Sequence, residues 1–211
     1  QQLRSMGVDL ALVSCLDILR DPRWGRSEEC FGEDPYLASR MAGAVVRGIQ
    51  SQGVEVTAKH LCAQGETTGG INASAARIGQ RELREIHLPP VKACVEAGVA
   101  AFMAAYNEID GVYCHANHWL LTELLRGEYG FGGFVMSDGV AIDQLDAVTG
   151  DRTASGALAL NAGVDMGLWD TGFQQLEEAV ARGLVKEERI DEAVKRILTV
   201  KFRRGLFDDP Y

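Results

Sequence analysis

A carboxylate at the end of an apolar segment is the feature of this chain that points most directly to chemistry. Gly133–Ser137 is predicted to form a short buried strand, and Asp138 follows it at once. Burying an ionisable group costs free energy unless it is paired, and active sites of parallel α/β folds lie at the C-terminal ends of strands. Asp138 is therefore a candidate catalytic residue. The alternative is that it caps a helix near Val140–Leu145, because aspartate is a favoured N-cap.

Polar side chains end three other predicted strands in the same way. If the strands run parallel, their C-terminal ends meet at one rim, so these side chains converge with Asp138 on a common site. Cations at such a rim can hold hydroxyl or carboxylate groups through charge-assisted hydrogen bonds. The set comprises Arg26 and Glu29 in the loop after Leu10–Ser14, Lys59 and His60 at the end of Val54–Lys59, and Tyr106 after Val99–Ala105.

Each of these residues also has a simpler interpretation. The charges of loop 21–35 could form salt bridges among themselves, and His60 could be a packed, hydrogen-bonded side chain. Lys59 could be a Schiff-base nucleophile, a donor to a substrate, or the ion-pair partner of a carboxylate. His115 and His118 have the spacing of a shared helix face, but no second cluster completes a ligand set, so no metal site is predicted.

Apolar, strand-like segments alternate with amphipathic, helix-like ones, which predicts βαβ units and a parallel sheet. Residues 1–211 show no linker or repeat and are expected to form one domain. Asp34 before Pro35 predicts a helix start, and Gly205 after basic residues predicts a helix end, with Pro210 beyond it. The expected strands are Leu10–Ser14, Val54–Lys59, Val99–Ala105, Gly133–Ser137 and Val164–Leu168, and the expected helices are Tyr36–Gln50, Gln80–Ala97, Trp119–Glu128, Ser155–Ala162, Phe173–Arg182 and Asp191–Arg203.

Composition narrows the class of partner. A net charge of -9 argues against nucleic acid, and no apolar run approaches the ~18 residues of a membrane span. The five cysteines are odd in number and lack a CxxC spacing, so a zinc framework is not predicted. Unpaired thiols favour a reducing compartment such as the cytoplasm, with secretion left open because the chain begins at Gln1.

The ordered motifs of the chain resemble those of the N-terminal barrel domain of glycoside hydrolase family 3, the β-glucosidase and β-xylosidase family. They cover nearly the whole chain, so the resemblance is specific. The motifs are Asp21-Pro22-Arg23-Trp24-Gly25-Arg26, Phe31-Gly32-Glu33-Asp34-Pro35, Lys59-His60, Arg81-Glu82-Leu83-Arg84-Glu85, Tyr106-Asn107, Asp110-Gly111, Leu120-Leu121-Thr122, Leu124-Leu125-Arg126, Tyr129-Gly130-Phe131, Ser137-Asp138, Arg196-Ile197-Leu198, Gly205-Leu206-Phe207 and Pro210-Tyr211.

The resemblance implies a fold, a reaction and a set of site residues. The implied fold is α/β, a partial (β/α)8 TIM-type barrel that lacks its first βα segments. The implied reaction is hydrolysis of terminal β-D-glycosides by a retaining mechanism, without a cofactor. The residues that fall on family site positions are Asp138 as nucleophile, Arg26, Lys59, His60 and Tyr106 as contacts of the glycone sugar or the nucleophile, Met103 near the sugar pocket, and Glu29 as the carboxylate that orients Arg26 or Lys59.

The chain departs from the family pattern at three places. Gly139 stands where Trp often follows the nucleophile, and Ile71 stands where a cation often follows the Gly69-Gly70 pair. Third, the first barrel segments are expected to lie outside these 211 residues, together with the second domain that supplies the general acid/base in most members. The chain is then expected to pack against that domain, with a small carbohydrate as substrate.

Several functions stay open on the sequence alone. Within the family, the chain could serve a β-xylosidase or an N-acetylhexosaminidase, although Leu61–Glu66 lacks the Pro-Gly-His-Gly-Asp pattern of the latter branch. Outside it, the chain could be a non-catalytic sugar-binding barrel fragment or an aldolase that uses Lys59. No spacing rule selects between Glu66 and Glu108 as an acid/base within the chain.

Overall fold

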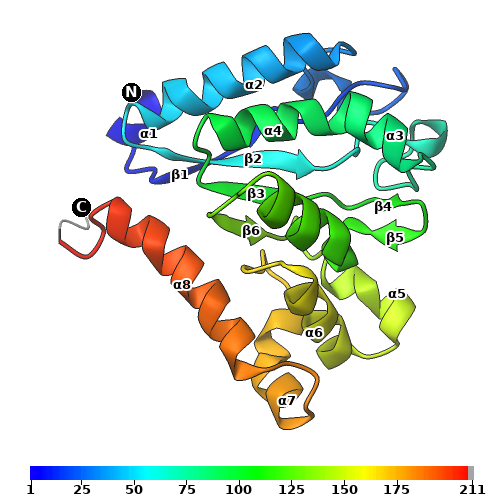
Figure 1. Cartoon of the computed structure of the whole chain (residues 1–211), viewed down its shortest axis with the longest axis vertical. Coiled ribbons are helices and arrows are strands. Elements are labelled where there is room, and N and C mark those ends of the chain that lie inside the picture. Colours follow the sequence, from blue (N-terminus) through cyan, green and yellow to red (C-terminus); the bar gives the residue numbers. More distant parts are fainter. Residues whose placement is uncertain (209–211) are drawn as a thin grey trace.

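The computed structural model describes residues 1–208, so the motif residues Pro210 and Tyr211 lie outside the described range. Its centre is a parallel four-stranded sheet with the strand order β1-β2-β3-β6 (Figure 1). Because neighbouring strands pair in chain order and all run parallel, their C-terminal ends share one rim. Four of the predicted strands are thereby confirmed, as β1 (Leu10–Ser14), β2 (Glu55–Leu61), β3 (Ala101–Ala104) and β6 (Phe134–Met136).

One face of the sheet packs against helices that lie side by side over it (Figure 1). Val56 and Phe102 belong to a core cluster with apolar side chains of α2 (Pro35–Gln50), α4 (Leu88–Glu96) and the π-helical segment Trp119–Glu128. Each helix carries its apolar residues as a stripe, and burying that stripe against the sheet supplies most of its stability.

The opposite face of the sheet is covered only in part. Met103 and Met136 pair in register and pack in one cluster with Ile197 of α8 (Glu187–Arg203). The strand register places the Leu12 side chain of β1 on the same face, but it is 45% exposed. An uncovered face beside an edge strand is what a partial barrel presents, since a closed barrel has no edge.

The predicted helices are confirmed, with some ends shifted. Asp34 starts α2 as expected, by accepting a hydrogen bond from the Tyr36 amide at 2.8 Å. Gly205, with φ +69°, follows α8 as the predicted terminating glycine, whereas α8 begins earlier than predicted. The other helices are α1 (Gln2–Ser5), α3 (Gln80–Glu82), α5 (Asp146–Thr149), α6 (Arg152–Ala162) and α7 (Leu176–Ala181), with a π-helical turn at Leu83–His87 between α3 and α4.

The fifth predicted strand, Val164–Leu168, does not form a regular ladder. It runs beside β6, to which a single bridge connects it. Backbone hydrogen bonds join the two segments at Met166, but side chains replace the backbone partners on either side of it: Asp165 accepts from the Val135 amide at 3.0 Å, and the Ser137 hydroxyl accepts from the Leu168 amide at 2.7 Å. The prediction of a strand is therefore wrong at this segment.

A short antiparallel hairpin that the sequence does not predict follows β3. Its strands are β4 (Glu108–Ile109) and β5 (Val112–Tyr113). Asp110 and Gly111 form the turn, both with positive φ (47° and 83°), as in the type I′ turns that aspartate-glycine pairs favour. Strands of this length leave no periodic signal in the sequence.

The cysteines are free thiols, as predicted, and four of the five are buried: Cys15, Cys62, Cys94 and Cys114. Burial raises the pKa of the Cys62 thiol well above its ordinary value, so this side chain packs as a small apolar group. Within residues 1–208, no helix has the length and hydrophobicity that crossing a bilayer requires.

Candidate active site

The C-terminal rim of the sheet carries the polar residues singled out in the sequence. Arg26 lies in the loop after β1, Tyr106 follows β3 and Asp138 follows β6, while Lys59 and His60 lie near the end of β2. The Arg26 guanidinium lies 3.1 Å from His60 Nε2, which lies 3.5 Å from Asp138 Oδ2. The structure thus places these side chains together, and their roles stay predictions.

A buried aspartate fixes the His60 ring. Asp17 Oδ2 lies 2.7 Å from His60 Nδ1 and also accepts from the His60 amide at 3.3 Å, and both side chains are buried. Because the Arg26 guanidinium has only donors, His60 Nε2 accepts its hydrogen bond. The ring proton therefore sits on Nδ1 and is donated to Asp17, which sets the tautomer.

Glu29 holds the Arg26 guanidinium from the other side. Arg26 donates to Glu29 through Nε at 2.6 Å and through a terminal nitrogen at 2.9 Å, a bidentate arrangement. The hydrogen bond from Arg26 lowers the pKa of Glu29 to about 2, with help from Ser14 and Lys59. Lys59 Nζ lies 3.9 Å from the same carboxylate, so Glu29 is positioned to orient both cations.

Asp138 is held through its main chain and keeps one carboxylate oxygen without a donor. Its amide donates to His115 Nε2 at 3.1 Å, and its Oδ1 accepts from the Gly139 amide at 2.8 Å. Its Oδ2 is buried without a hydrogen-bond partner among residues 1–208 and faces the His60 ring. An unpaired buried carboxylate oxygen costs free energy, and no group among the described residues compensates this cost through a hydrogen bond.

The helix-cap alternative for Asp138 is wrong. The nearest helical turn is the 3-10 segment Asp143–Leu145, which has Ile142 at its N-cap position and no side-chain cap. The Asp138 carboxylate instead accepts from its own neighbour, Gly139. Asp138 therefore does not cap a helix, and capping does not explain why its carboxylate is buried.

His115 is a neutral acceptor beneath Asp138. Burial lowers its pKa to about 3, against the opposing effect of a hydrogen bond to the Ala105 backbone. Because its Nε2 accepts from the Asp138 amide, that nitrogen carries no proton, and His115 fixes the backbone without adding charge. The structure places His118 elsewhere, exposed and 3.3 Å from Glu123.

Tyr106 reaches the Asp138 turn from β3, whereas Met103 lies below the rim. The Tyr106 hydroxyl donates to the Gly139 carbonyl at 2.8 Å. Burial, together with the charge of Asp138, raises the pKa of Tyr106 to about 12, so the hydroxyl keeps its proton. Met103 is 2% exposed and packs with Met136 in the apolar layer under the polar side chains.

A second buried aspartate ties the Asp138 turn to the next loop. The Ser137 hydroxyl donates to Asp170 Oδ2 at 2.5 Å, and the same oxygen accepts from the Leu168 amide at 2.9 Å. Asp170 Oδ1 accepts from the Ile142 amide at 2.8 Å, and burial raises the pKa of this carboxyl. The segments that flank Asp138 are thus fixed by the fold itself, which favours a preorganised site.

Three of these supporting residues escape sequence reasoning: Asp17, His115 and Asp170. Only Asp17 carries a usable signal, because an acidic residue between Leu16 and Ile18 is rarely buried without a partner. His115 is considered on the sequence only as a metal ligand. The structure gives it a different task, that of an acceptor for the backbone of Asp138.

Removing the Asp17 carboxylate should release the His60 ring. In Asp17→Ala the buried ring N–H and the His60 amide lose their acceptor, so we expect the free energy of unfolding to fall by about 1–3 kcal/mol. We also expect a mixture of His60 tautomers. Urea unfolding measures the first effect, and the ¹⁵N chemical shifts of the ring measure the second.

The matched control for Asp17 is Asp21→Ala in the same loop. The Asp21 side chain is 16% exposed and, within residues 1–208, accepts only from its near neighbour Arg23, whose side chain is 70% exposed, and pairs with one exposed partner add little stability. This control should lower stability less than Asp17→Ala does and should leave the His60 tautomer unchanged. Equal behaviour of the two variants would contradict a positioning role for Asp17.

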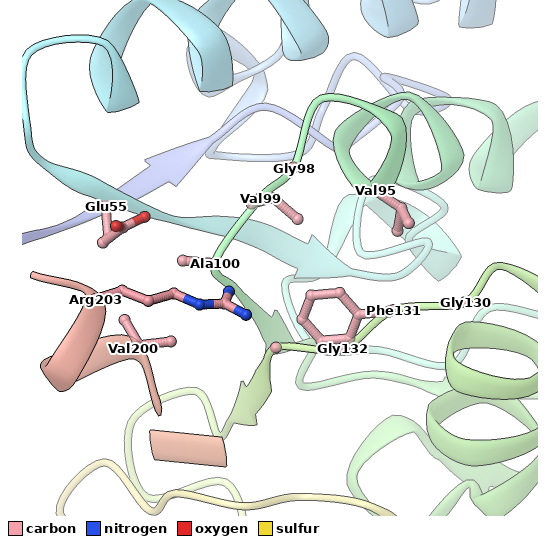
Figure 2. A pocket seen from close by; sticks show the side chains of 11 residues that line it. Glu55, Val95, Gly98, Val99, Ala100, Gly130, Phe131, Gly132, Val200 and Arg203 are labelled. Carbon is pink, nitrogen blue, oxygen red and sulfur yellow. The ribbon is translucent and has the colours of Figure 1, made fainter. Parts of the chain in front are cut away.

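The cavity shown in Figure 2 lies at the other end of the sheet. Its volume is about 210 Å³. Its lining includes Glu55 at the start of β2, Ala100 before β3, Gly133 before β6 and Arg203 of α8. These are N-terminal strand ends, so the cavity lies away from the rim that carries Asp138.

Known proteins share both the sequence and the architecture of this chain. The family model described as Glycosyl hydrolase family 3 N terminal domain matches residues 1–200. A β-xylosidase of Formosa agariphila is 38% identical over 231 residues, which cover 99% of this chain and 32% of that protein. A periplasmic β-glucosidase of Salmonella typhimurium is 36% identical, over 97% of this chain and 28% of that protein. The structure of a β-glucosidase from Erythrobacter marinus matches with a TM-score of 0.95 and 37% identity, over 99% of this chain and 29% of that one.

The parallel α/β sheet and the structural match together identify a TIM-barrel-type domain, and the predicted fold class is confirmed. More particularly, the chain belongs to glycosyl hydrolase family 3, within its N-terminal domain. The chain spans less than a third of the length of the relatives named above.

Proposed function

We propose that this chain supplies the nucleophile and the sugar-binding rim of a retaining β-glycosidase, with Asp138 as the nucleophile. The observation that carries the proposal is the buried, unpaired Oδ2 of Asp138, on the same rim as Arg26, Lys59 and His60. The names of the relatives, β-glucosidases and a β-xylosidase, support the class of reaction. The substrate is a terminal non-reducing β-D-glucoside, with a β-xyloside as the alternative.

The proposed reaction proceeds in two displacements. Asp138 attacks the anomeric carbon while the bond to the leaving oxygen breaks, and an acid protonates that oxygen. The product is a glycosyl ester of Asp138. The conjugate base then takes a proton from water, which attacks the same carbon and frees the carboxylate. Each displacement inverts the carbon, so the overall configuration is retained.

The cations of the rim are proposed to bind the hydroxyls of the glycone sugar. Arg26 and Lys59 donate charge-assisted hydrogen bonds, which are stronger than neutral ones, and Glu29 keeps both side chains in place. The fixed ring of His60 and the hydroxyl of Tyr106, which keeps its proton, are proposed to contact the same sugar. Met103 is proposed to form the apolar floor of the pocket beneath them. Holding the sugar in one orientation lowers the entropic part of the barrier.

The general acid/base is proposed to lie outside these 211 residues, which form one domain packed against another that supplies it. Glu66 is a poor acid, because Arg20 and His87 each lie 3.1 Å from its carboxylate. The hydrogen bond with His87 lowers the pKa of Glu66, whereas a general acid at neutral pH needs a raised one. Glu108 belongs to the β4–β5 hairpin.

An aldolase that uses Lys59 finds no support in the geometry. Imine formation needs a free amine, whereas Lys59 Nζ lies 3.9 Å from the Glu29 carboxylate, as an ion pair. A non-catalytic sugar-binding role would use the same rim and would differ only in the absence of turnover. Covalent trapping of the nucleophile separates the two roles.

Covalent trapping tests the nucleophile directly in the complete protein that contains these residues. A 2-fluoro-β-glucoside with a good leaving group should form a stable ester, because the fluorine slows the second displacement more than the activated first. We expect peptide mass spectrometry to find the label on Asp138. A label on another residue would overturn the assignment. Binding of glucose without any labelling would instead support the sugar-binding role.

A further inference from the structure

A tryptophan stands exposed beside the Asp138 turn. The side chain of Trp169 is 78% exposed, whereas that of Trp24 is 1% exposed. Aromatic side chains normally bury most of their large apolar surface, so an exposed indole next to a candidate catalytic carboxylate needs an explanation. Trp169 follows the segment that runs beside β6, and neither the fold nor the reaction described above uses it.

The backbone on both sides of Trp169 is fixed by buried carboxylates. The Leu168 amide donates to the Ser137 hydroxyl and to Asp170 Oδ2 at 2.7 and 2.9 Å. On the other side, the amides of Thr171 and Gly172 donate to Asp143 at 3.0 and 2.8 Å. The loop that carries the Trp169 indole is therefore held in one conformation by these hydrogen bonds.

Trp169 also adopts a strained backbone conformation, with φ +64°. For a bulky residue this region costs on the order of 1–3 kcal/mol, and it persists only where the surroundings impose it. The cost brings no burial of the ring against residues 1–208 in return. The conformation presents the ring to solvent at the rim.

The ring lies directly beside the residue after the nucleophile. A Cβ built on Gly139 would lie 3.4 Å from Trp169 Cε3 and 3.5 Å from the Tyr106 hydroxyl. Because Gly139 has no side chain, the indole surface there stays uncovered. Trp169 approaches Asp138 through Gly139, whereas the His60 ring faces the carboxylate at Oδ2.

We propose that Trp169 is the platform for the leaving group of the substrate, either a second sugar ring or an aryl ring. This assignment rests on the proposed function, because it needs Asp138 as the nucleophile. In sheet order, the loop with Trp169 lies on the far side of β6 from β1 and β2, which carry the glycone contacts. A ring that stacks on the indole covers apolar surface that is otherwise exposed to water.

The test compares substrates that share the glucosyl group and differ in the leaving group. In the complete protein, Trp169→Ala should lower kcat/KM for an aryl β-glucoside and for cellobiose about threefold to tenfold. The same variant should leave kcat/KM for β-glucosyl fluoride unchanged, because fluoride offers no ring to the platform. Trp169→Phe should restore most of the loss, because it restores an aromatic face.

The control is Tyr36→Ala, which removes another aromatic side chain, 72% exposed, from α2 and should change none of these rates. An equal loss with glucosyl fluoride, or no loss with any substrate, would overturn the platform. Absence of hydrolysis of every substrate by the unmodified protein would overturn the proposed function and the platform with it. Hydrolysis with an unchanged Trp169→Ala variant would overturn the platform alone.

Discussion

Replacing Asp138 with asparagine is expected to lower kcat/KM for an aryl β-glucoside by about a thousandfold or more, which corresponds to about 4 kcal/mol of transition-state stabilisation. The amide keeps the shape of the side chain, and its oxygen can still accept from the Gly139 amide, so the fold should persist. It lacks the charge and the free lone pair that attack the anomeric carbon. Steady-state kinetics of the complete protein measure the loss.

The matched control is Asp110→Asn, the same chemical change in the exposed turn between β4 and β5. Its φ of 47° suits asparagine, and the variant should have unchanged kinetics. A complementary test uses Asp138→Ala with added azide, which can attack from the vacated face. The expected product is α-glucosyl azide, formed by a single inversion. Wild-type rates in Asp138→Asn, or a β-azide, would contradict the assignment.

The sheet was within reach of sequence reasoning because its strands are continuous apolar runs between turn residues. The same signal wrongly predicts a strand at Val164–Leu168. There the Asp165 carboxylate and the Ser137 hydroxyl accept from backbone amides that would bond to a neighbouring strand in a regular ladder. Side chains that compete with the backbone leave no trace in hydrophobic periodicity. The β4–β5 hairpin is missed because its strands are too short to show a hydrophobic period.

The rim could be predicted because strand ends are local and parallel pairing brings them together. The partners that hold each side chain could not be predicted, because they are distant in sequence and meet only in the folded protein. Asp17 and His60 are separated by 43 positions, and their pairing becomes visible only once β1 lies beside β2. His115 likewise reaches the Asp138 amide from a segment that the sequence analysis weighed only as a metal site.

Replacing Asp165 with asparagine is expected to lower the free energy of unfolding by about 3–5 kcal/mol. The Asp165 side chain is fully buried, and asparagine would turn donors toward groups that are themselves donors. Burial lowers the pKa of Arg126 to about 10, so this guanidinium stays charged at neutral pH and would lose its anion. The carboxylate accepts from Arg126 at 2.6 Å, from Arg189 and Arg196 at 2.8 Å each, and from the Val135 amide at 3.0 Å.

The matched control is Glu192→Gln, which removes the exposed partner of the same Arg196, at 3.4 Å and 60% exposed. Exposed pairs on a helix surface add little, so urea unfolding should show almost no change for this variant. Both variants remove a carboxylate from Arg196, but only Asp165→Asn also removes the buried acceptor of Arg126, Arg189 and the Val135 amide. Asp165 joins β6 to α8 through Arg189 and Arg196, so its loss should also speed hydrogen exchange at the Val135 amide. Equal stability of the two variants would mean that α8 is held to the sheet by its apolar contacts alone.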